Sequence, residues 1–434
     1  MKRKKRMSDA PRIHLASLGC AKNLVDSERL LGRLATAGAL VGADAEDADV
    51  IIVNTCGFIA PAVEESLQVI GDYVAMKRAS ASQRLYVMGC LVERDASALR
   101  ETLPEVDGFF GIEEQDRLVA AIGLHAEDDG ARLLLTPAHS AYLRISDGCD
   151  NRCSYCTIPA IRGPFRSRPE TEIFDEARQL VERGALELNL IGQDTSLYGA
   201  DRRDGIRIGE LLRRLDSLDG LRWLRLLYTH PAHFEDALID AYARLERLIP
   251  YVDLPLQHLN DDILSRMGRK VTSAQCLSLI DRLRRRVEDV VLRTTFIVGF
   301  PGETDAQFDE LLDAVREIRF DHIGAFAFSP EVGTPAYSMA RQVPDELKAE
   351  RVERLMLAQQ EIVRDANRGR IGETAQVLIE EAAAEEGLWI GRTVGQAPDV
   401  DSVTFVRGAN VVEGTIVSVR IVGFEDYDLV AEAD

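Results

Sequence analysis

The sequence has few cysteines, few basic residues and no long apolar run, and each shortage excludes a class of protein. Its longest apolar stretches, such as residues 50–53, are far too short to cross a bilayer. The seven cysteines are an odd number without framework spacing, which argues against structural disulfides and favours a reducing cytoplasm. Because 72 Asp and Glu outweigh 52 Lys and Arg, the net charge is −20. A general nucleic-acid binder, which presents a basic surface, is therefore not expected.

The amino-terminal residues carry a local excess of positive charge. Five basic side chains follow one another at residues 2–6, but the apolar segment of a secretory signal does not come after them. We therefore expect a solvated tail and no signal peptide. Contact of this tail with RNA or a ribosome surface is the alternative.

Three cysteines in one short segment give the sharpest positive signal. Cys149, Cys153 and Cys156 have the spacing C-x3-C-x2-C. Four cysteines usually hold an iron–sulfur cluster, so three would leave one iron open for chemistry. Zinc is the alternative, but it favours a second cysteine pair or histidines nearby, and neither lies close downstream of Cys156. We predict an iron–sulfur cluster here.

Three more cysteines follow apolar segments that read as β-strands. Cys20, Cys56 and Cys90 are separated by 35 and 33 intervening residues, and a helical pattern follows each. Repeated strand-then-helix units predict a parallel α/β sheet, in which ligands bind outside the carboxyl ends of the strands. A single cysteine there would read as a small buried hydrophobe. Three at equivalent strand ends favour a shared site.

Strands and helices alternate again from about residue 141. Six such units predict an incomplete version of the eight-unit (β/α) TIM barrel, with the Cys149 loop after its first strand, at the face where barrel enzymes keep their active sites. Cys276 reads as a core residue. The arginine-rich segment 282–286 reads as the solvated face of a helix. The expected strands are 141–146, 186–191, 222–228, 251–256, 291–298 and 321–328.

The last part of the chain has a different texture. A long charged helix, expected over 345–368, precedes short alternating strands with glycine turns, which predict a small antiparallel β-barrel. An acidic loop at 127–130 separates the first two parts. We expect three domains, at 11–125, 135–368 and 371–434. The five short strands are expected at 375–380, 388–391, 402–406, 414–421 and 427–431.

The Cys149–Cys156 segment resembles the signature of the radical S-adenosylmethionine superfamily, including the aromatic Tyr155 before the last cysteine. This resemblance implies a radical SAM barrel in which S-adenosylmethionine chelates the open iron and is cleaved reductively to a 5′-deoxyadenosyl radical. Two strand ends are candidates for binding S-adenosylmethionine, and the alternative is that both are ordinary βα turns. His258 is either a structural residue or part of the site. The candidate cofactor-binding residues are Tyr155, Gln193, Asp194, Gly299, Gly302 and Glu303.

The order of the three parts is similar to that of the methylthiotransferases, over about residues 11–434. In that family the cysteines matching Cys20, Cys56 and Cys90 hold a second, auxiliary 4Fe-4S cluster, whose open iron carries the inserted sulfur. S-adenosylmethionine then serves twice, and the net change is C–H to C–S–CH3. The resemblance also implies that residues 371–434 form a TRAM domain, OB-like in fold, for substrate recognition.

Two branches of that family differ in substrate. Segments 17–28, 53–59 and 255–258 look like the branch that acts on the β-carbon of an aspartate in small-subunit ribosomal protein twelve, free or in the ribosome. The acidity of residues 371–434, with 13 Asp and Glu against 3 Arg and no Lys, would repel tRNA and attract a basic protein. The resemblance further implies an electron donor such as flavodoxin or ferredoxin, a cytoplasmic location and no membrane partner.

Two alternatives remain open at this point. One is an enzyme of the other branch, a tRNA adenosine methylthiotransferase. The other is a binding or assembly factor that uses its clusters structurally. Trp389 and Phe405 could supply apolar substrate contacts, with core packing as the simpler role.

Overall fold

The computed structural model describes residues 10–80, 82–125 and 130–433. The basic run at 2–6 and the acidic residues 127–129 lie outside the described residues. The chain divides into two units: Met1–Leu135 with Gly148–Asp150 and Thr157–Phe165, and the remainder. None of the helices in the described ranges is both long enough and apolar enough to span a membrane.

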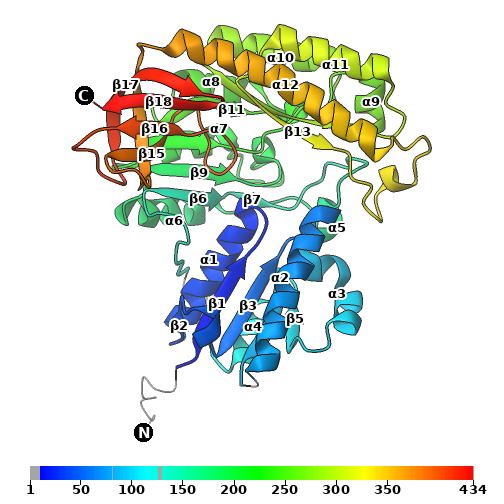
Figure 1. Ribbon diagram of the computed structural model, residues 1–434, viewed down its shortest axis with the longest axis vertical. Helices are drawn as coiled ribbons and strands as arrows, with labels where there is room; N and C mark the ends of the chain where they lie inside the picture. The colour runs from blue at the N-terminus through cyan, green and yellow to red at the C-terminus, as the bar shows by residue number, and fades with distance from the viewer. Residues whose placement is uncertain (1–9, 81, 126–129, 434) are drawn as a thin grey trace. The chain divides into compact units, whose positions relative to one another are not determined.

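The first unit contains a five-stranded parallel sheet in the order β2-β1-β3-β4-β5, which confirms the predicted α/β arrangement (Figure 1). From β1 the chain continues to β2 at one edge of the sheet, whereas from β3 it continues to β4 and β5 toward the other edge. The direction in which strands are added therefore reverses between β1 and β3. Such a reversal opens a crevice outside the carboxyl ends of the strands. The elements are β1 (Arg12–Ser17), α1 (Ala21–Thr36), β2 (Leu40–Val41), β3 (Val50–Thr55), α2 (Ala60–Ala79), β4 (Arg84–Gly89), α3 (Cys90–Thr102), β5 (Gly108–Phe110) and α4 (Gln115–Ile122).

Helices cover both faces of this sheet, so its central strand is buried along its whole length. Alternate side chains of β3 enter two separate cores. Ile52 packs with Leu30 and Leu34 of α1, whereas Ile51 packs on the other face with Ile70 of α2. The period of two along the strand thus fixes which helix each residue contacts.

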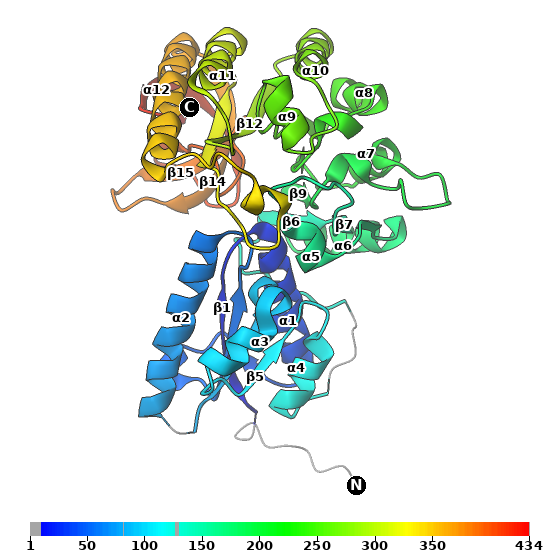
Figure 2. The same cartoon turned by 90° about the vertical axis from the view of Figure 1, so that its right-hand side faces the viewer.

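The second unit contains six parallel strands in the order β13-β12-β11-β10-β9-β6, as predicted for an incomplete (β/α) barrel. Figure 2 shows the helices of this unit in an arc around the strands. The strands are β6 (Ser140–Arg144), β9 (Glu187–Ile191), β10 (Trp223–Leu226), β11 (Leu248–Asp253), β12 (Val291–Val298) and β13 (His322–Ala327). The helices are α6 (Glu170–Glu182), α7 (Ile208–Asp216), α8 (Asp236–Arg244), α9 (Asp261–Arg266), α10 (Ser273–Arg286), α11 (Asp305–Ile318) and α12 (Asp345–Arg370).

The first of these strands is shorter than the sequence pattern indicated. It ends at Arg144, because the next residues leave the sheet and form β7 (Ser146–Asp147), which pairs with β8 (Arg166–Ser167). The cysteine loop and the short helix α5 (Ile158–Arg162) lie between β7 and β8. This small pair therefore anchors both ends of the segment that carries Cys149, Cys153 and Cys156.

The carboxyl-terminal residues form the predicted five-stranded barrel, and it is closed. Four of its strand pairs are antiparallel, whereas β16 and β18 run parallel. Closure satisfies every strand edge, and Trp389 packs against the interior, as the simpler prediction had it. The strands are β14 (Thr374–Ala382), β15 (Leu388–Thr393), β16 (Thr404–Arg407), β17 (Ile416–Glu425) and β18 (Asp428–Ala433).

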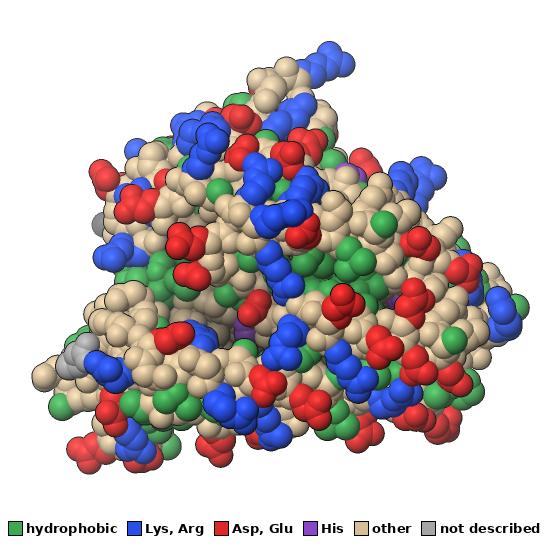
Figure 3. All heavy atoms as spheres, turned by 90° about the horizontal axis from the view of Figure 1, so that it is seen from above, with side chains coloured by type: hydrophobic (Ala, Val, Ile, Leu, Met, Phe, Trp, Pro, Cys, Tyr) green, Lys and Arg blue, Asp and Glu red, His purple; other side chains and the backbone are tan. Residues whose placement is uncertain are grey.

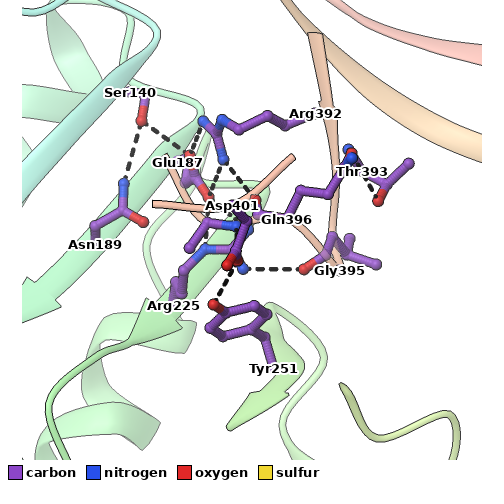
Figure 4. Close-up of polar contacts among 12 residues, drawn as sticks. Ser140, Glu187, Asn189, Arg225, Tyr251, Arg392, Thr393, Gly395, Gln396 and Asp401 are labelled. Carbon is purple, nitrogen blue, oxygen red and sulfur yellow. Dashed lines mark hydrogen bonds and ion pairs between the residues drawn. The ribbon is translucent and has the colours of Figure 1, made fainter. Parts of the chain in front are cut away.

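A buried polar network joins this barrel to the six-stranded sheet (Figure 4). Arg392 of β15 and Arg225 of β10 both donate to Glu187, the first residue of β9. The Tyr251 hydroxyl donates to Asp401 over 2.5 Å. Because Glu187 is the first residue of β9, its contacts with Arg225 and Arg392 lie at the amino-terminal end of that strand, opposite the end where barrel enzymes place their sites.

Candidate functional site

Cys20, Cys56 and Cys90 come together at the carboxyl ends of β1, β3 and β4. Cys20 directly precedes α1, Cys56 follows β3, and Cys90 opens α3. Two glycines allow the turns to approach closely. A Cβ on Gly19 would lie 2.8 Å from the Cβ of Cys56, and one on Gly57 would lie 2.7 Å from the Cα of Leu91. Larger residues at these positions would push the cysteine-bearing turns apart.

The electrostatics of the three thiols indicate a shared site. The pKa of Cys90 is raised to about 12, chiefly by burial; Arg162 opposes this rise, and the neighbouring Cys20 and Cys56 add to it. Burial also raises the pKa of Cys56, with Cys20 adding to the effect. Thiolates are the form that binds metal, and a bound metal removes their protons. The three thiols therefore fit a group that supplies positive charge.

The spacing of the three sulfurs can be compared with the spacing around a single zinc ion. A tetrahedral zinc with Zn–S bonds of about 2.3 Å holds its sulfurs only about 3.8 Å apart. Among the described residues, the set whose ligand atoms all lie within 4.8 Å of one another is Asp194, His230 and His233, not these cysteines. The three sulfurs are therefore not as close together as the ligands of a tetrahedral zinc ion would be.

Polar side chains that the sequence did not single out surround Cys90. Asn23 Oδ1 accepts from the Cys90 thiol over 3.2 Å and from Arg162 Nη2 over 2.8 Å. The same Nη2 lies 3.6 Å from Cys90 Sγ and 2.9 Å from Asp26 Oδ2. Arg162 belongs to α5, which folds with the first unit, and all of these side chains are nearly inaccessible to solvent.

The second cysteine triad lies on the loop between β7 and β8. Cys149 belongs to the first unit, where its N–H donates to the Gly163 carbonyl, whereas Cys153 and Cys156 belong to the second. The backbone N–H of Ser154 donates to the Met267 carbonyl over 2.8 Å, which holds the loop beside the end of α9. A second buried arginine, Arg269, directs its guanidinium at Cys153 Sγ over 4.0 Å.

Tyr155 packs its ring into an apolar cluster that includes Met267 and Phe300. Burial raises the pKa of its phenol well above the ordinary range, and the adjacent Cys153 thiol raises it further. The side chain therefore stays neutral and forms an apolar wall beside the last cysteines of the loop.

Gln193 and Asp194 follow β9, next to the end of β6. Gln193 donates to Asp147 over 3.2 Å, but its buried Oε1 atom has no hydrogen-bond partner among the described residues, and neither has Ser146 Oγ. A Cβ on Gly192 would lie 2.4 Å from that same Ser146 hydroxyl, so the two unpaired atoms share one strand-end region. Buried unpaired polar atoms are costly, and they fit a site for a polar ligand.

Asp194 lies beside two histidines that the sequence did not reveal, and one of them, His233, is hydrogen-bonded to its carboxylate. Its carboxylate accepts from Asn151 over 2.8 Å and lies 2.6 Å from His233 Nδ1. His230 Nδ1 accepts from the Ala232 N–H, so a neutral ring carries its proton on Nε2, and burial lowers the pKa of His230 to about 3. A metal ion would have to displace that proton, so the arrangement favours a hydrogen-bond relay.

The turn after β12 lies against α12. A Cβ on Gly299 would meet Lys348 at 2.3 Å, and one on Gly302 would meet Arg266 at 2.7 Å. Glu303 lies 3.3 Å from Arg351, and burial raises the pKa of Glu303 to about 6. Its other oxygen accepts from the Phe300 N–H, so this turn is held at the carboxyl end of β12 by its own contacts.

His258 follows β11 and is fully buried. Its Nδ1 atom accepts from the Asn260 N–H, and its Nε2 atom has no partner in the part of the chain that the structure describes. Burial lowers the pKa of this ring to about 3, so it is neutral at pH 7. The contact with Asn260 gives this histidine at least a structural role.

Three parts of the chain match known protein families. Residues 143–315 match the radical SAM superfamily, residues 12–111 match the Uncharacterized protein family UPF0004, and residues 371–433 match the TRAM domain. Solved structures of TsrM from Kitasatospora setae, a radical S-adenosylmethionine methyltransferase, share the fold. One covers 82% of this chain and 90% of that chain, at 16% identity with a TM-score of 0.57.

Curated relatives match over almost their whole length. "Ribosomal protein uS12 methylthiotransferase RimO" of Heliobacterium modesticaldum is 45% identical, over 97% of this chain and 95% of the relative. The protein of the same name from Anaeromyxobacter sp. is 44% identical, over 96% of this chain and 92% of the relative. This family uses 4Fe-4S clusters and S-adenosylmethionine, as the two cysteine triads predicted. The chain belongs to the RimO family of radical SAM methylthiotransferases.

Proposed function

We propose that this enzyme replaces a hydrogen on the β-carbon of an aspartate in ribosomal protein uS12 by a methylthio group. The observation that carries the proposal is the meeting of Cys20, Cys56 and Cys90 at one switch point of the first sheet. That triad stands apart in sequence from Cys149, Cys153 and Cys156. A radical enzyme that only abstracts hydrogen needs one cluster, whereas sulfur insertion needs a second group that delivers sulfur.

The two groups supply different chemistry when bound: S-adenosylmethionine gives the methyl group and the radical, and the auxiliary cluster carries the sulfur. Cys20, Cys56 and Cys90 would hold the auxiliary 4Fe-4S cluster. Their burial, except at Cys20, would keep water from it.

Cys149, Cys153 and Cys156 would hold the radical SAM cluster, with Tyr155 as the apolar wall beside it. Gln193 and Asp194 would bind polar groups of S-adenosylmethionine, which the unpaired Gln193 Oε1 supports. Gly299, Gly302 and Glu303 would contribute through the backbone of their turn at the end of β12.

The surface of the small barrel supports a basic protein as the substrate. Over its described residues, nine acidic side chains are exposed against two arginines, Arg407 and Arg420. Its third arginine, Arg392, is buried and already paired. On the face drawn in Figure 3, basic side chains are interspersed with acidic ones and form no continuous basic surface, which a phosphate backbone would require. The same charge disfavours tRNA.

Three further assignments belong to this proposal. Residues 11–125 would act as the sulfur-delivering domain, residues 135–368 as the radical SAM core, and residues 371–434 as the substrate-recognition domain. The electron donor would be a small redox protein such as flavodoxin or ferredoxin. The enzyme would work in the cytoplasm, where its thiols stay reduced.

Mass spectrometry on the two rival substrates tests the proposal. The iron-reconstituted chain is incubated with S-adenosylmethionine, a reductant and either purified uS12 or tRNA. We expect one aspartate of uS12 to exchange one hydrogen for SCH3, and the tRNA to stay unchanged. Modification of tRNA without uS12 would overturn the substrate assignment, and cluster-loaded protein that never cleaves S-adenosylmethionine would overturn the enzymatic one.

A further inference from the structure

Arg162 occupies a position that neither the sequence motifs nor the family assignment explains. It ends the short helix α5, yet its guanidinium is buried among side chains of the first unit, with 6% of the residue exposed. Burying a guanidinium is costly unless it is paired and fully hydrogen-bonded. One nitrogen, Nη2, contacts Asp26, Asn23 and the sulfur of Cys90 at 2.9, 2.8 and 3.6 Å.

The orientation of Asn23 is fixed by its own contacts. Its Nδ2 atom donates to the Leu18 carbonyl over 3.0 Å and to the Thr55 carbonyl over 2.9 Å. Its Oδ1 atom must therefore face Cys90 and Arg162. When Cys90 ligates iron its thiol proton is lost, and Asn23 Oδ1 would face a thiolate. Arg162 then bridges the two acceptors, because it donates to Asn23 and places positive charge beside the sulfur.

We propose that Arg162 is a positioning residue that sets the reduction potential of the cluster held by Cys20, Cys56 and Cys90. This inference rests on the proposed function, which assigns these cysteines as ligands. Hydrogen bonds and positive charge at cluster sulfurs stabilise the reduced, more negative state and raise its potential. In the ion pair with Asp26, the positive side chain is the one nearer to Cys90. Arg162 therefore raises the reduction potential of the cluster, whereas Asp26 lowers it.

The chain contains a matched control. Arg132 is also 6% exposed, lies in the same unit and pairs with a buried carboxylate of α1, Glu28. None of the hydrogen bonds or ion pairs described for Arg132 involves a cysteine sulfur. Its replacement therefore reproduces the loss of a buried ion pair without changing the charge at Cys90.

The test is a redox titration of the auxiliary cluster in the full chain, followed by electron paramagnetic resonance. Cys149, Cys153 and Cys156 are first changed to alanine, so that only the auxiliary cluster gives a signal. Arg162→Gln should lower the ratio of reduced to oxidised cluster about tenfold at a fixed potential, a shift of about 59 mV for a one-electron couple. Asp26→Asn should shift the ratio the other way, and Arg132→Gln should leave it unchanged.

The outcomes distinguish a failure of the role inferred for Arg162 from a failure of the proposed cluster ligands. An unchanged ratio in Arg162→Gln, or an equal shift in Arg132→Gln, overturns the role of Arg162. If Arg162→Gln fails to retain iron, Asp26→Asn decides, because a structural defect would not raise the potential. A background chain that binds no cluster, with Arg162 intact, shows instead that the ligand assignment is wrong.

Discussion

Neutralising Glu187 should loosen the small barrel from the six-stranded sheet. Its carboxylate is fully buried and accepts from Arg225 over 3.0 Å and from Arg392 over 2.6 Å (Figure 4). Glu187→Gln keeps the shape of the side chain but leaves two buried guanidiniums with less compensating charge. Removing one partner of a buried pair costs about 3–5 kcal/mol.

The titration of Glu187 gives an independent magnitude. Burial favours its neutral form, but Arg392 and Arg225 outweigh burial and lower its pKa from the ordinary 4.5 to about 2. At 1.36 kcal/mol per unit, this shift corresponds to about 3 kcal/mol. Because the pKa is depressed in the folded state, this stability is present above pH 4.5 and is lost as the pH falls toward 2.

Urea unfolding followed by tryptophan fluorescence measures the effect. The chain has two tryptophans, Trp223 on β10 and Trp389 on β15, one on each side of this network. At pH 7 the midpoint of Glu187→Gln should fall by about 1 M, for a slope of about 3 kcal/mol per M. Glu385→Gln, which removes an exposed pair with Arg407, should change stability by less than about 1 kcal/mol.

Two results would refute this reasoning. One is a Glu187→Gln variant that unfolds at the wild-type urea concentration. The other is a difference in urea midpoint between wild type and variant that stays the same size when the pH falls below 4.5. The double variant Glu187→Gln, Arg392→Met should lose less stability than the two single losses combined, because one uncompensated charge is removed.

Three further predictions concern the cofactors. Cys56→Ala should spare reductive cleavage of S-adenosylmethionine but stop methylthio transfer, whereas Cys153→Ala should abolish both reactions. Cleavage is measured as 5′-deoxyadenosine formed. Equal loss of cleavage in the two variants would contradict the division of roles between the triads. Gly57→Ala should lower the iron content from about eight to about four per chain, since its Cβ would meet the Leu91 backbone at 2.7 Å. Gly71→Ala on α2, where nothing lies within 4 Å, should retain all of it. Gln193→Ala should raise the KM for S-adenosylmethionine about tenfold, the loss of one hydrogen bond to a charged ligand, and an unchanged KM would exclude this residue from the site.

Periodicity was sufficient to predict the longer strands and the parallel direction of the two large sheets, but not the short strands β2 and β5. The run at 50–53 reads as a buried strand, and Val50–Thr55 is buried throughout. The five short carboxyl-terminal strands also appear where alternation and glycine turns placed them. The end of β6 was missed because Ser146 and Asp147 continue an extended pattern while pairing with a different partner. The pattern of residues along a segment predicts that its backbone is extended, but it does not predict which strand the segment pairs with.

The polar residues around Cys90 could not be found in this way. Asn23 and Asp26 are polar residues near the start of α1, on the same face as the core residues Leu30 and Leu34, where a sequence reader expects apolar side chains. The structure buries them because their partner, Arg162, is contributed from far along the chain. His230 and His233 were missed for the same reason, since their link to Asp194 joins the ends of two different strands. Helical periodicity cannot distinguish a solvated polar face from one buried against another polar group.

Both cysteine triads have a buried arginine beside one sulfur, but the two arginines are compensated differently. Arg162 shares its positive charge with the carboxylate of Asp26. Arg269, beside Cys153, donates to the Pro255 carbonyl, which is a neutral acceptor. A neutral acceptor leaves more of the positive charge directed at the sulfur than a carboxylate does. If Cys149, Cys153 and Cys156 hold the radical SAM cluster, as proposed, the charge of Arg269 would stabilise its reduced state and so ease its reduction. If Cys20, Cys56 and Cys90 hold a cluster that delivers sulfur, as proposed, a weaker field at Cys90 would suit a group that is not the primary electron acceptor.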